Sequence, residues 1–198
     1  MNIIVTGFEA FLKNNENPSL EVIRLLPKSI KGHFIHTLEL PVAYDDCFDP
    51  LKKLIEKVNP EIVICLGLAQ GRKFITPERV AINLKDVSAP DNNGLIQQDV
   101  KISETGKNAY FTTLPIKQMV ANMTEKGIPA RLSNTAGTYV CNNVMYHLLE
   151  YNERNNLKMK AGFIHVPLMD EQKNDQGHFS LPLPTILEGI IDSIKACL

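Results

Sequence analysis

The sequence predicts one α/β domain over residues 1–198, a three-layer α/β/α sandwich built on a mainly parallel, twisted sheet. This prediction rests on the order of the apolar runs and on the lack of a segment that would divide the chain. Short apolar runs typical of buried strands alternate with longer runs whose apolar residues recur at helical spacing. That alternation is typical of a parallel sheet covered by helices on both faces. No repeat, linker or low-complexity segment divides the chain, and its length suffices for one core.

The amino-terminal part contains a strand, a loop and a helix. Residues 2–7, NIIVTG, form a short β-branched run that ends in glycine, as a buried strand does. A polar loop at residues 13–16 follows. Asn17 and Pro18 suit the N-cap and the first position of a helix, which must end before Pro27.

The next three elements repeat this order. Residues 34–40, FIHTLEL, alternate apolar and polar side chains like a strand. Asp49 and Pro50 open a helix with apolar residues at helical spacing, and residues 59–60, Asn-Pro, end it. Residues 61–66, EIVICL, are then predicted to form a buried strand.

The second half of the chain is less regular at its start. Between residues 67 and 107 only residues 78–84 have the pattern of a strand, and residues 88–94 are rich in turn formers. The remaining predicted elements alternate again: a helix at 115–126, a strand at 129–133, a helix at 138–152, a strand at 160–166 and a helix at 184–196.

Composition excludes several classes of function. The net charge of -1 and the lack of a basic stripe argue against nucleic-acid binding. No apolar run approaches the ~18 residues that would span a membrane, and the start, MNIIVTGFEAF, does not resemble a signal peptide. We therefore expect a cytoplasmic protein. The four cysteines are widely spaced without a CxxC pair, so no metal or redox site is predicted.

Unusual residues gather where predicted strands end. Ligand sites of parallel sheets lie at the carboxyl ends of the strands. Residues 7–11, 67–72 and 133–141 each follow a predicted strand, and His165 lies close to the end of its own strand. These segments should therefore converge on one site.

Cys141 has two interpretations. The apolar spacing of residues 140–149 favours a core cysteine. Residues 135–138 are expected to turn the chain and cap the helix, which leaves Cys141 in or near its first turn. This place favours a stabilised thiolate and an oxyanion site at the free N–H groups. His165, among apolar residues, is either a buried structural histidine or a general base for this thiol.

Glu78, judged by its neighbours alone, would be a surface carboxylate paired with Arg72 or Arg79.

Four blocks of the sequence resemble the type I pyroglutamyl peptidases, also called pyrrolidone-carboxylate peptidases. They match the family nearly end to end, in the same order and spacing: TGFEAF at 6–11 with NPS at 17–19, ITPERVAIN at 75–83, SNTAGTYVCN at 133–142 and GFIHVP at 162–167.

This resemblance implies a cysteine exopeptidase that removes amino-terminal pyroglutamyl residues from peptides through a thioester. It implies that Cys141 is the nucleophile, His165 the general base and acid, and Glu78 the residue that orients His165. No metal or organic cofactor is implied. The residues matching the family's substrate pocket are Phe8, Phe11, Asn17, Leu68 and Val140.

Two departures from the family pattern concern this site. Leu68 replaces a glutamine near the substrate, and Ser88 replaces the arginine associated with the oxyanion region. Loss of an oxyanion donor typically lowers turnover by ~10²–10³. The resemblance therefore predicts an enzyme that could be slower than its relatives.

Two other functions stay open at this point. The chain could be a related amidase acting on another small acyl or cyclic amide, or a catalytically impaired paralogue that only binds pyroglutamyl ends. Family members commonly form dimers or tetramers, so the resemblance also predicts a homodimer or homotetramer.

Overall fold

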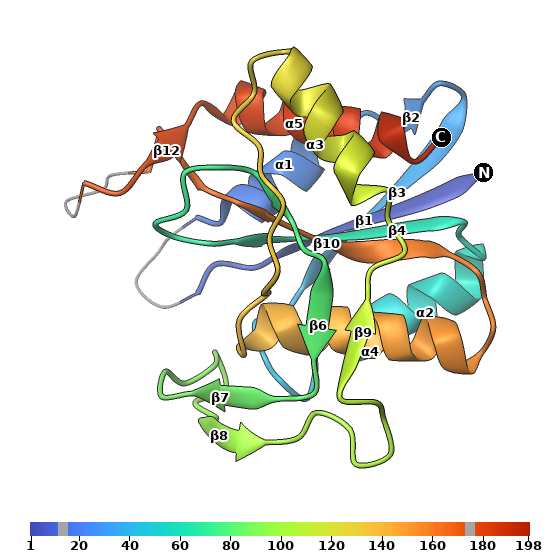
Figure 1. Ribbon diagram of the computed structural model, residues 1–198, viewed down its shortest axis with the longest axis vertical. Coiled ribbons are helices and arrows are strands. Elements are labelled where there is room, and N and C mark those ends of the chain that lie inside the picture. The colour runs from blue at the N-terminus through green and yellow to red at the C-terminus, as the bar shows by residue number, and fades with distance from the viewer. Residues whose placement is uncertain (12–15, 173–176) are drawn as a thin grey trace.

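A six-stranded sheet forms the centre of the molecule. The computed structural model describes residues 1–11, 16–172 and 177–198 (Figure 1). The sheet runs in the order β2-β3-β1-β4-β10-β5. Its strands are β1 (Asn2–Phe8), β2 (Ser29–Ile30), β3 (His33–Leu40), β4 (Ile62–Leu68), β5 (Thr76–Pro77) and β10 (Lys160–Val166). The four central strands are parallel, and the short edge strands β2 and β5 are antiparallel to their neighbours.

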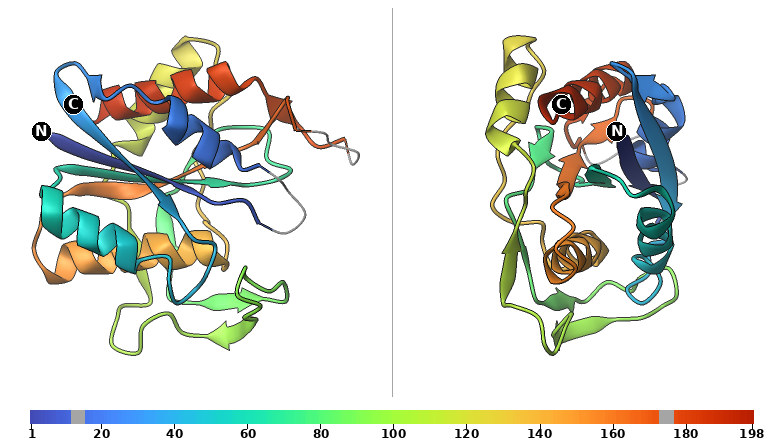
Figure 2. Two further views of the ribbon diagram at one scale, coloured as in Figure 1. Left: turned by 180° about the vertical axis from the view of Figure 1, so that it is seen from behind. Right: turned by 90° about the vertical axis from the view of Figure 1, so that its right-hand side faces the viewer.

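Helices cover both faces of this sheet, so the predicted sandwich is confirmed. One face carries α1 (Pro18–Leu25), α3 (Ile116–Glu125) and α5 (Leu183–Ala196). The other carries α2 (Asp49–Val58) and α4 (Val140–Arg154). Figure 2 shows the same layers from behind and from the side. Among the described residues, no helix is long and apolar enough to cross a membrane.

Three two-stranded ribbons lie outside the central sheet. They pair β6 (Val80–Ile82) with β9 (Ala109–Phe111), β7 (Lys85–Val87) with β8 (Gln97–Val100), and β11 (Leu168–Met169) with β12 (Ser180–Leu181). The first two ribbons lie beside and below α4 in Figure 1. Of the predicted strand at 78–84, only its middle part forms β6. The predicted polar loop at 13–16 falls almost wholly outside the described residues.

Most predicted boundaries agree with the structure because their local signals are strong. Asn17 caps α1 by accepting a hydrogen bond from the Ser19 N–H, and Pro18 occupies the first turn. The α1 helix ends at Leu25, before Pro27. Likewise α2 ends at Val58, and Asn59 after it adopts the left-handed conformation typical of a helix end.

The predicted strand at 129–133 is wrong. This segment lies beside residues 75–78 but forms only two isolated bridges, Ile75 with Ala130 and Glu78 with Ser133. Ile75 donates to Pro129 and accepts from Arg131, as in a parallel ladder. The next bond would need an N–H at position 77, where proline has none, and the ladder is interrupted there.

The expected cap of α4 is also wrong. The helix begins at Val140 after Tyr139, and no side chain caps it. The Thr138 hydroxyl donates instead to the Asp86 carbonyl, and the Thr135 hydroxyl accepts from the Gly137 N–H. The first turn of α4 therefore keeps backbone N–H groups that no side chain satisfies.

One edge of the sheet brings the end of β10 close to the start of α4. Side chains alternate along a strand, so Ala161, Phe163 and His165 of β10 point to the α4 side. Gly67 of β4 is in register with His165. The carboxyl ends of β1, β4 and β10 point to the side of the molecule where α4 begins, on the left in Figure 1. The fold thus places His165 and the start of α4 at one edge.

Candidate active site

The residues predicted for the site lie across the sheet in strand order. Phe8 ends β1, Leu68 ends β4, His165 is in β10, and Glu78 follows β5. Neighbouring strands are about 4.8 Å apart, so these residues form a row rather than a cluster. Cys141 comes to this row from α4.

The Cys141 thiol occupies the space that Gly67 leaves empty. A β-carbon built on Gly67 would lie 2.9 Å from the Cys141 Sγ and 2.7 Å from the tip of the Phe163 ring. Because Gly67 stands beside His165 in the ladder, the sulfur lies over the strand adjacent to the histidine. The structure thus brings Cys141 and His165 to neighbouring positions. The His165 ring forms no hydrogen bond with the thiol among the described contacts; such bonds often tighten only when substrate binds.

Cys141 belongs to the first turn of α4, where backbone donors are free. Cys141 is the second residue of the helix, and the helix has no side-chain cap. The N–H groups of a first turn have no acceptor within their own helix, and the helix dipole places partial positive charge there. This end of α4 is therefore suited to stabilise an oxygen that becomes negative next to Cys141.

His165 is held by Glu78. Its Nδ1 lies 2.7 Å from the Glu78 Oε1, and both side chains are buried. An ionised carboxylate only accepts hydrogen bonds, so Nδ1 carries the proton. In the neutral imidazole this leaves Nε2 as an unprotonated base. Glu78 is fully buried, and its interpretation as a surface carboxylate is wrong.

Burial keeps both reacting groups neutral. Although Cys141 is partly exposed, the groups packed around its sulfur raise the pKa of the thiol to about 12. Burial also lowers the pKa of His165 below its ordinary value, against the opposing effect of Glu78. Burial therefore opposes the thiolate that the start of a helix favours.

Of the two partners that the sequence suggested for Glu78, the structure confirms Arg72, but inside the site rather than on the surface. Its guanidinium donates through Nη1 to the same Glu78 oxygen that His165 uses, and through Nη2 to the Thr135 carbonyl, 2.9 Å away. The sequence signal was its place at the end of the glycine-containing segment 67–72. That signal did not show that Arg72 contacts Glu78, because the fold of the loop before β5 brings the two residues together.

A small apolar cavity of about 40 Å³ opens beside the thiol. It is lined by Phe8, Phe11, Asn17, Val42, Leu68, Tyr139, Val140 and Cys141. All five residues predicted for the substrate pocket therefore line one cavity together with Cys141. Val42 and Tyr139 were missed, although Tyr139 directly precedes Val140 and packs its ring against Phe11 with centroids 6.4 Å apart.

Ser88 lies outside this cavity. It is exposed and follows β7. The segment around it is nevertheless attached to the start of α4, since Asp86 exchanges hydrogen bonds with Thr138 and the Pro90 carbonyl accepts from the Tyr139 hydroxyl. A role in the oxyanion region stays a prediction.

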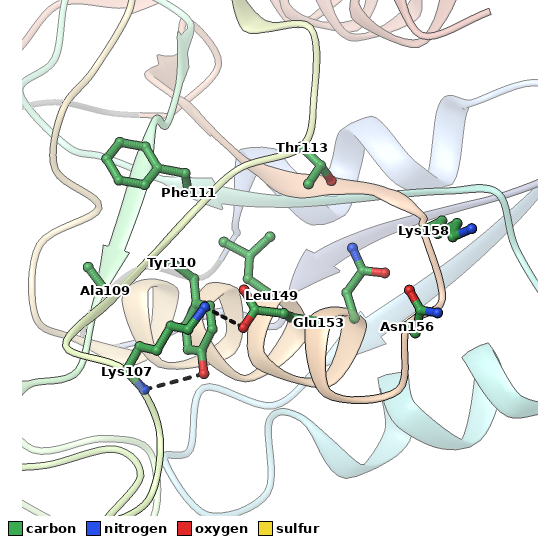
Figure 3. Close-up of a pocket in the computed structure, with 10 residues that line it drawn as sticks. Lys107, Ala109, Tyr110, Phe111, Thr113, Leu149, Glu153, Asn156 and Lys158 are labelled. Carbon is green, nitrogen blue, oxygen red and sulfur yellow. Dashed lines mark hydrogen bonds and ion pairs between the residues drawn. The ribbon is translucent and has the colours of Figure 1, made fainter.

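A larger cavity of about 380 Å³ lies at the other end of α4 (Figure 3). Lys107, Phe111 and Glu153 are among its lining residues, and Lys107 pairs with Glu153 at 2.6 Å. This cavity has no thiol or histidine in its lining. Within the described ranges, no group of three His, Cys, Asp or Glu residues could hold a metal ion.

Comparison with known proteins assigns the chain to a family. The pyroglutamyl peptidase family matches residues 1–198. The chain is 46% identical over 197 residues to the pyrrolidone-carboxylate peptidase of Streptococcus suis, covering 99% of this chain and 92% of that protein. It is 44% identical over 199 residues to that of Thermosipho melanesiensis, covering 100% and 98%. The crystal structure of Bacillus amyloliquefaciens pyroglutamyl peptidase I superposes with a TM-score of 0.95 at 37% identity, over 99% of this chain and 96% of that one. The chain therefore belongs to the pyroglutamyl peptidase family of cysteine peptidases.

Proposed function

We propose that the chain removes an amino-terminal pyroglutamyl residue from peptides through a thioester intermediate. The observation that carries the proposal is the position of Cys141, at the uncapped start of α4, beside the His165–Glu78 pair and in the wall of a small apolar cavity. The membership of the family and the names of its relatives support the same substrate.

The reaction begins with a proton transfer. As the Cys141 sulfur attacks the pyroglutamyl carbonyl carbon, the His165 Nε2 takes the thiol proton. The carbonyl oxygen becomes negative and faces the N–H groups of the first turn of α4. Glu78 holds the imidazolium that forms, through the proton on Nδ1.

Collapse of this intermediate releases the shortened peptide. The imidazolium gives its Nε2 proton to the leaving amine as the carbon–nitrogen bond breaks, and a thioester remains on Cys141. Water, deprotonated by the same nitrogen, then attacks the thioester. Pyroglutamate leaves, and the sulfur regains its proton.

The cavity explains the choice of residue. Pyroglutamate is a compact, uncharged lactam, and an apolar wall with few polar groups suits it. A cavity of about 40 Å³ has room for only a few water molecules, so we expect its walls to part for the ring. We expect the partly buried rings of Phe11 and Tyr139 to move. A closed pocket also admits only a chain end.

The decisive test is release of a fluorophore from a pyroglutamyl amide. We expect wild-type protein to hydrolyse it and the variants Cys141→Ala and His165→Ala to lose this activity. Cys197→Ala is the matched control, because its thiol is buried in the opposite core. Full activity in Cys141→Ala would exclude the proposed mechanism.

Ser88 supplies a test of rate. If the missing arginine limits turnover, Ser88→Arg should raise kcat by up to about 10²-fold, the typical effect of one oxyanion donor. An unchanged kcat would show that the α4 N–H groups suffice.

The other two functions give different results in the same assays. An amidase for another acyl group would prefer a prolyl, glutaminyl or other amide in a substrate panel. A binding-only paralogue would hydrolyse none of them. We also propose a homodimer or homotetramer in the cytoplasm, which light scattering and cell fractionation would check.

A further inference from the structure

Glu78 carries a buried charge that needs a partner. It has no exposed surface, and its Oε1 accepts both the His165 Nδ1–H and an Arg72 N–H. Its other oxygen, Oε2, has no hydrogen-bond partner among the described residues. A buried carboxylate is costly unless an opposite charge compensates it. Arg72 is the positively charged group in contact with Glu78.

Arg72 is fixed in place by the same loops that build the site. Its Nη1 lies 2.7 Å from the Thr76 Oγ1 and 3.3 Å from the Ser133 Oγ, and its Nη2 bonds the Thr135 carbonyl. Thr76 is in register with His165. The guanidinium thus reaches Glu78 from one side while the imidazole reaches it from another.

We propose that Arg72 is a positioning residue that prevents the Glu78–His165 pair from taking up an extra proton, so that His165 Nε2 stays available as the base. This inference rests on the proposed function, in which His165 accepts the thiol proton.

An extra proton would disable the base wherever it resides. If it binds His165, the ring becomes imidazolium and Nε2 is occupied. If it binds Glu78, the carboxylic acid donates to Nδ1, and the neutral ring then carries its own proton on Nε2. The proposal therefore does not depend on which of the two residues binds the proton.

The charges around His165 favour this role. Charged groups reach it from Glu78, after β5, and from Arg72, after β4; α4 contributes the neutral Cys141 thiol. Burial and the Arg72 charge lower the pKa of His165, whereas Glu78 raises it. Without Arg72 only burial would oppose Glu78.

The test compares the pH dependence of kcat/KM in four proteins. In Arg72→Met, which keeps side-chain length without charge, we expect the acid limb to move up by about one pH unit or more, a tenfold larger loss at low pH. Arg72→Lys should keep the limb near its wild-type position at a lower rate. Arg24→Met is the matched control: Arg24 pairs with Glu21 in α1 and does not touch Glu78.

A second readout does not require activity. Nitrogen chemical shifts of the His165 ring at neutral pH should show Nδ1–H with a free Nε2 in wild type and a protonated Nε2 in Arg72→Met. An unchanged limb and unchanged shifts in Arg72→Met would overturn the proposal. If wild type shows these shifts but does not cleave the amide, the proposed function fails instead.

Two further cavities lie on the surface beyond Arg72. A cavity of about 320 Å³ includes Arg72, Lys73 and Arg131 in its lining, and one of about 430 Å³ includes Arg79 and Lys117. The Arg79–Asn134 hydrogen bond connects the two. Neither lining contains an acidic residue, although the chain has a net charge of -1. We call these two cavities the basic groove.

The order of the strands gives the direction of the bound peptide. The apolar cavity lies at the ends of β1 and β4, and His165 lies in β10, further across the sheet. Since His165 must protonate the leaving amine, the leaving peptide lies on the β10 side of the thiol. Arg72 lies beyond His165 in that direction, and there the basic groove begins.

We infer, on the basis of the proposed function, that the basic groove binds the leaving part of the peptide and favours acidic side chains there. Lys73 and Arg131 are exposed and have no ion-pair partner among the described residues. Their attraction for a carboxylate is modest at an exposed site, so the preference should be about 3- to 10-fold in kcat/KM.

Matched pyroglutamyl peptides with Glu, Ala or Lys at the second and third residues after the cleaved bond test this inference. We expect the order Glu, Ala, Lys, weakening with added salt. Reversing both charges in Lys73→Glu with Arg131→Glu should reverse the order, and Lys158→Glu, at the far cavity, should not. Equal rates for the three peptides, or an order that survives the double reversal, would overturn it. The small fluorogenic amide does not reach the groove, so wild type and these charge-reversal variants should cleave it equally. Loss of this cleavage in wild type would instead contradict the proposed function.

Discussion

The two ends of α4 face cavities of opposite character. The cavity at its start holds only about 40 Å³ and has an almost wholly apolar wall that includes the Cys141 thiol. The cavity at its end holds about 380 Å³ and contains charged residues, of which Lys107 and Glu153 neutralise each other (Figure 3). Size alone would point to the wrong end.

The difference shows what makes a cavity a site. At the far end Lys107 and Glu153 form an ion pair that is more than half exposed, an arrangement that contributes little to stability. At the near end a nucleophile, a base and uncapped backbone donors lie next to an apolar wall, and burial has moved the pKa of both reacting groups. Perturbed groups of this kind mark functional sites. Four experiments compare the two ends.

Gly67→Ala should have the largest effect. The added methyl group would lie 2.9 Å from the Cys141 Sγ and 2.7 Å from the Phe163 ring, so the sulfur or the ring must shift. We expect about a 100-fold loss of kcat/KM, because misplacement of a reacting group by about 1 Å costs that much. The free energy of unfolding should fall by about 1–3 kcal/mol. Normal kinetics in this variant would place the thiol elsewhere.

Exchanging one phenylalanine at each end gives the next largest effect. Phe11 lines the small cavity, and we expect Phe11→Ala to lower kcat/KM about 10- to 200-fold, the usual range for hydrophobic substrate contacts. Phe111 lines the large cavity and is 68% exposed. Phe111→Ala should leave kcat/KM unchanged. Equal losses in both variants would remove the distinction between the cavities.

The pH dependence of activity should reflect the lowered pKa of His165, which lies near the start of α4. Neutral His165 is the active form, and burial lowers its pKa, so the rate should begin to fall only below about pH 6.5, the ordinary histidine value. The same shift makes stability fall with acidification through that window, because the unfolded chain binds the proton more readily. A rate that already falls between pH 8 and 7 on acidification would contradict the assignment.

Lys107→Met should have the smallest effect. It breaks the ion pair with Glu153 at the far cavity, where both partners are more than half exposed. We expect no change in kcat/KM and at most a small shift in the melting temperature. A clear loss of activity would mean that the far end of α4 takes part in catalysis.

The fold was largely predictable because its signals are local. Buried parallel strands are short β-branched runs, and helices such as α1 and α2 begin and end at Asn, Asp and Pro. Segment 129–133 failed because its pairing depends on a distant residue, Pro77, that lacks an N–H. The cap of α4 failed for a similar reason, since Thr138 bonds Asp86, 52 residues earlier.

The site was predictable in its members but not in its electrostatics. Motifs named Cys141, His165, Glu78 and the five pocket residues, and the structure brings them together; their roles stay predictions. Arg72 had no such motif, because its role depends on a contact with Glu78 in the folded chain. The raised pKa of Cys141 was not predictable, because the sequence shows its place on a helix but not the packing around its sulfur.

Because the other three cysteines are buried, the number of reactive thiols reports whether the chain is folded. Cys47, Cys65 and Cys197 are at most 1% exposed, whereas Cys141 is partly exposed. A thiol reagent should therefore label one cysteine in the native chain and four in the unfolded chain. Counting labelled thiols along a denaturant series would report the folded fraction without any probe being added.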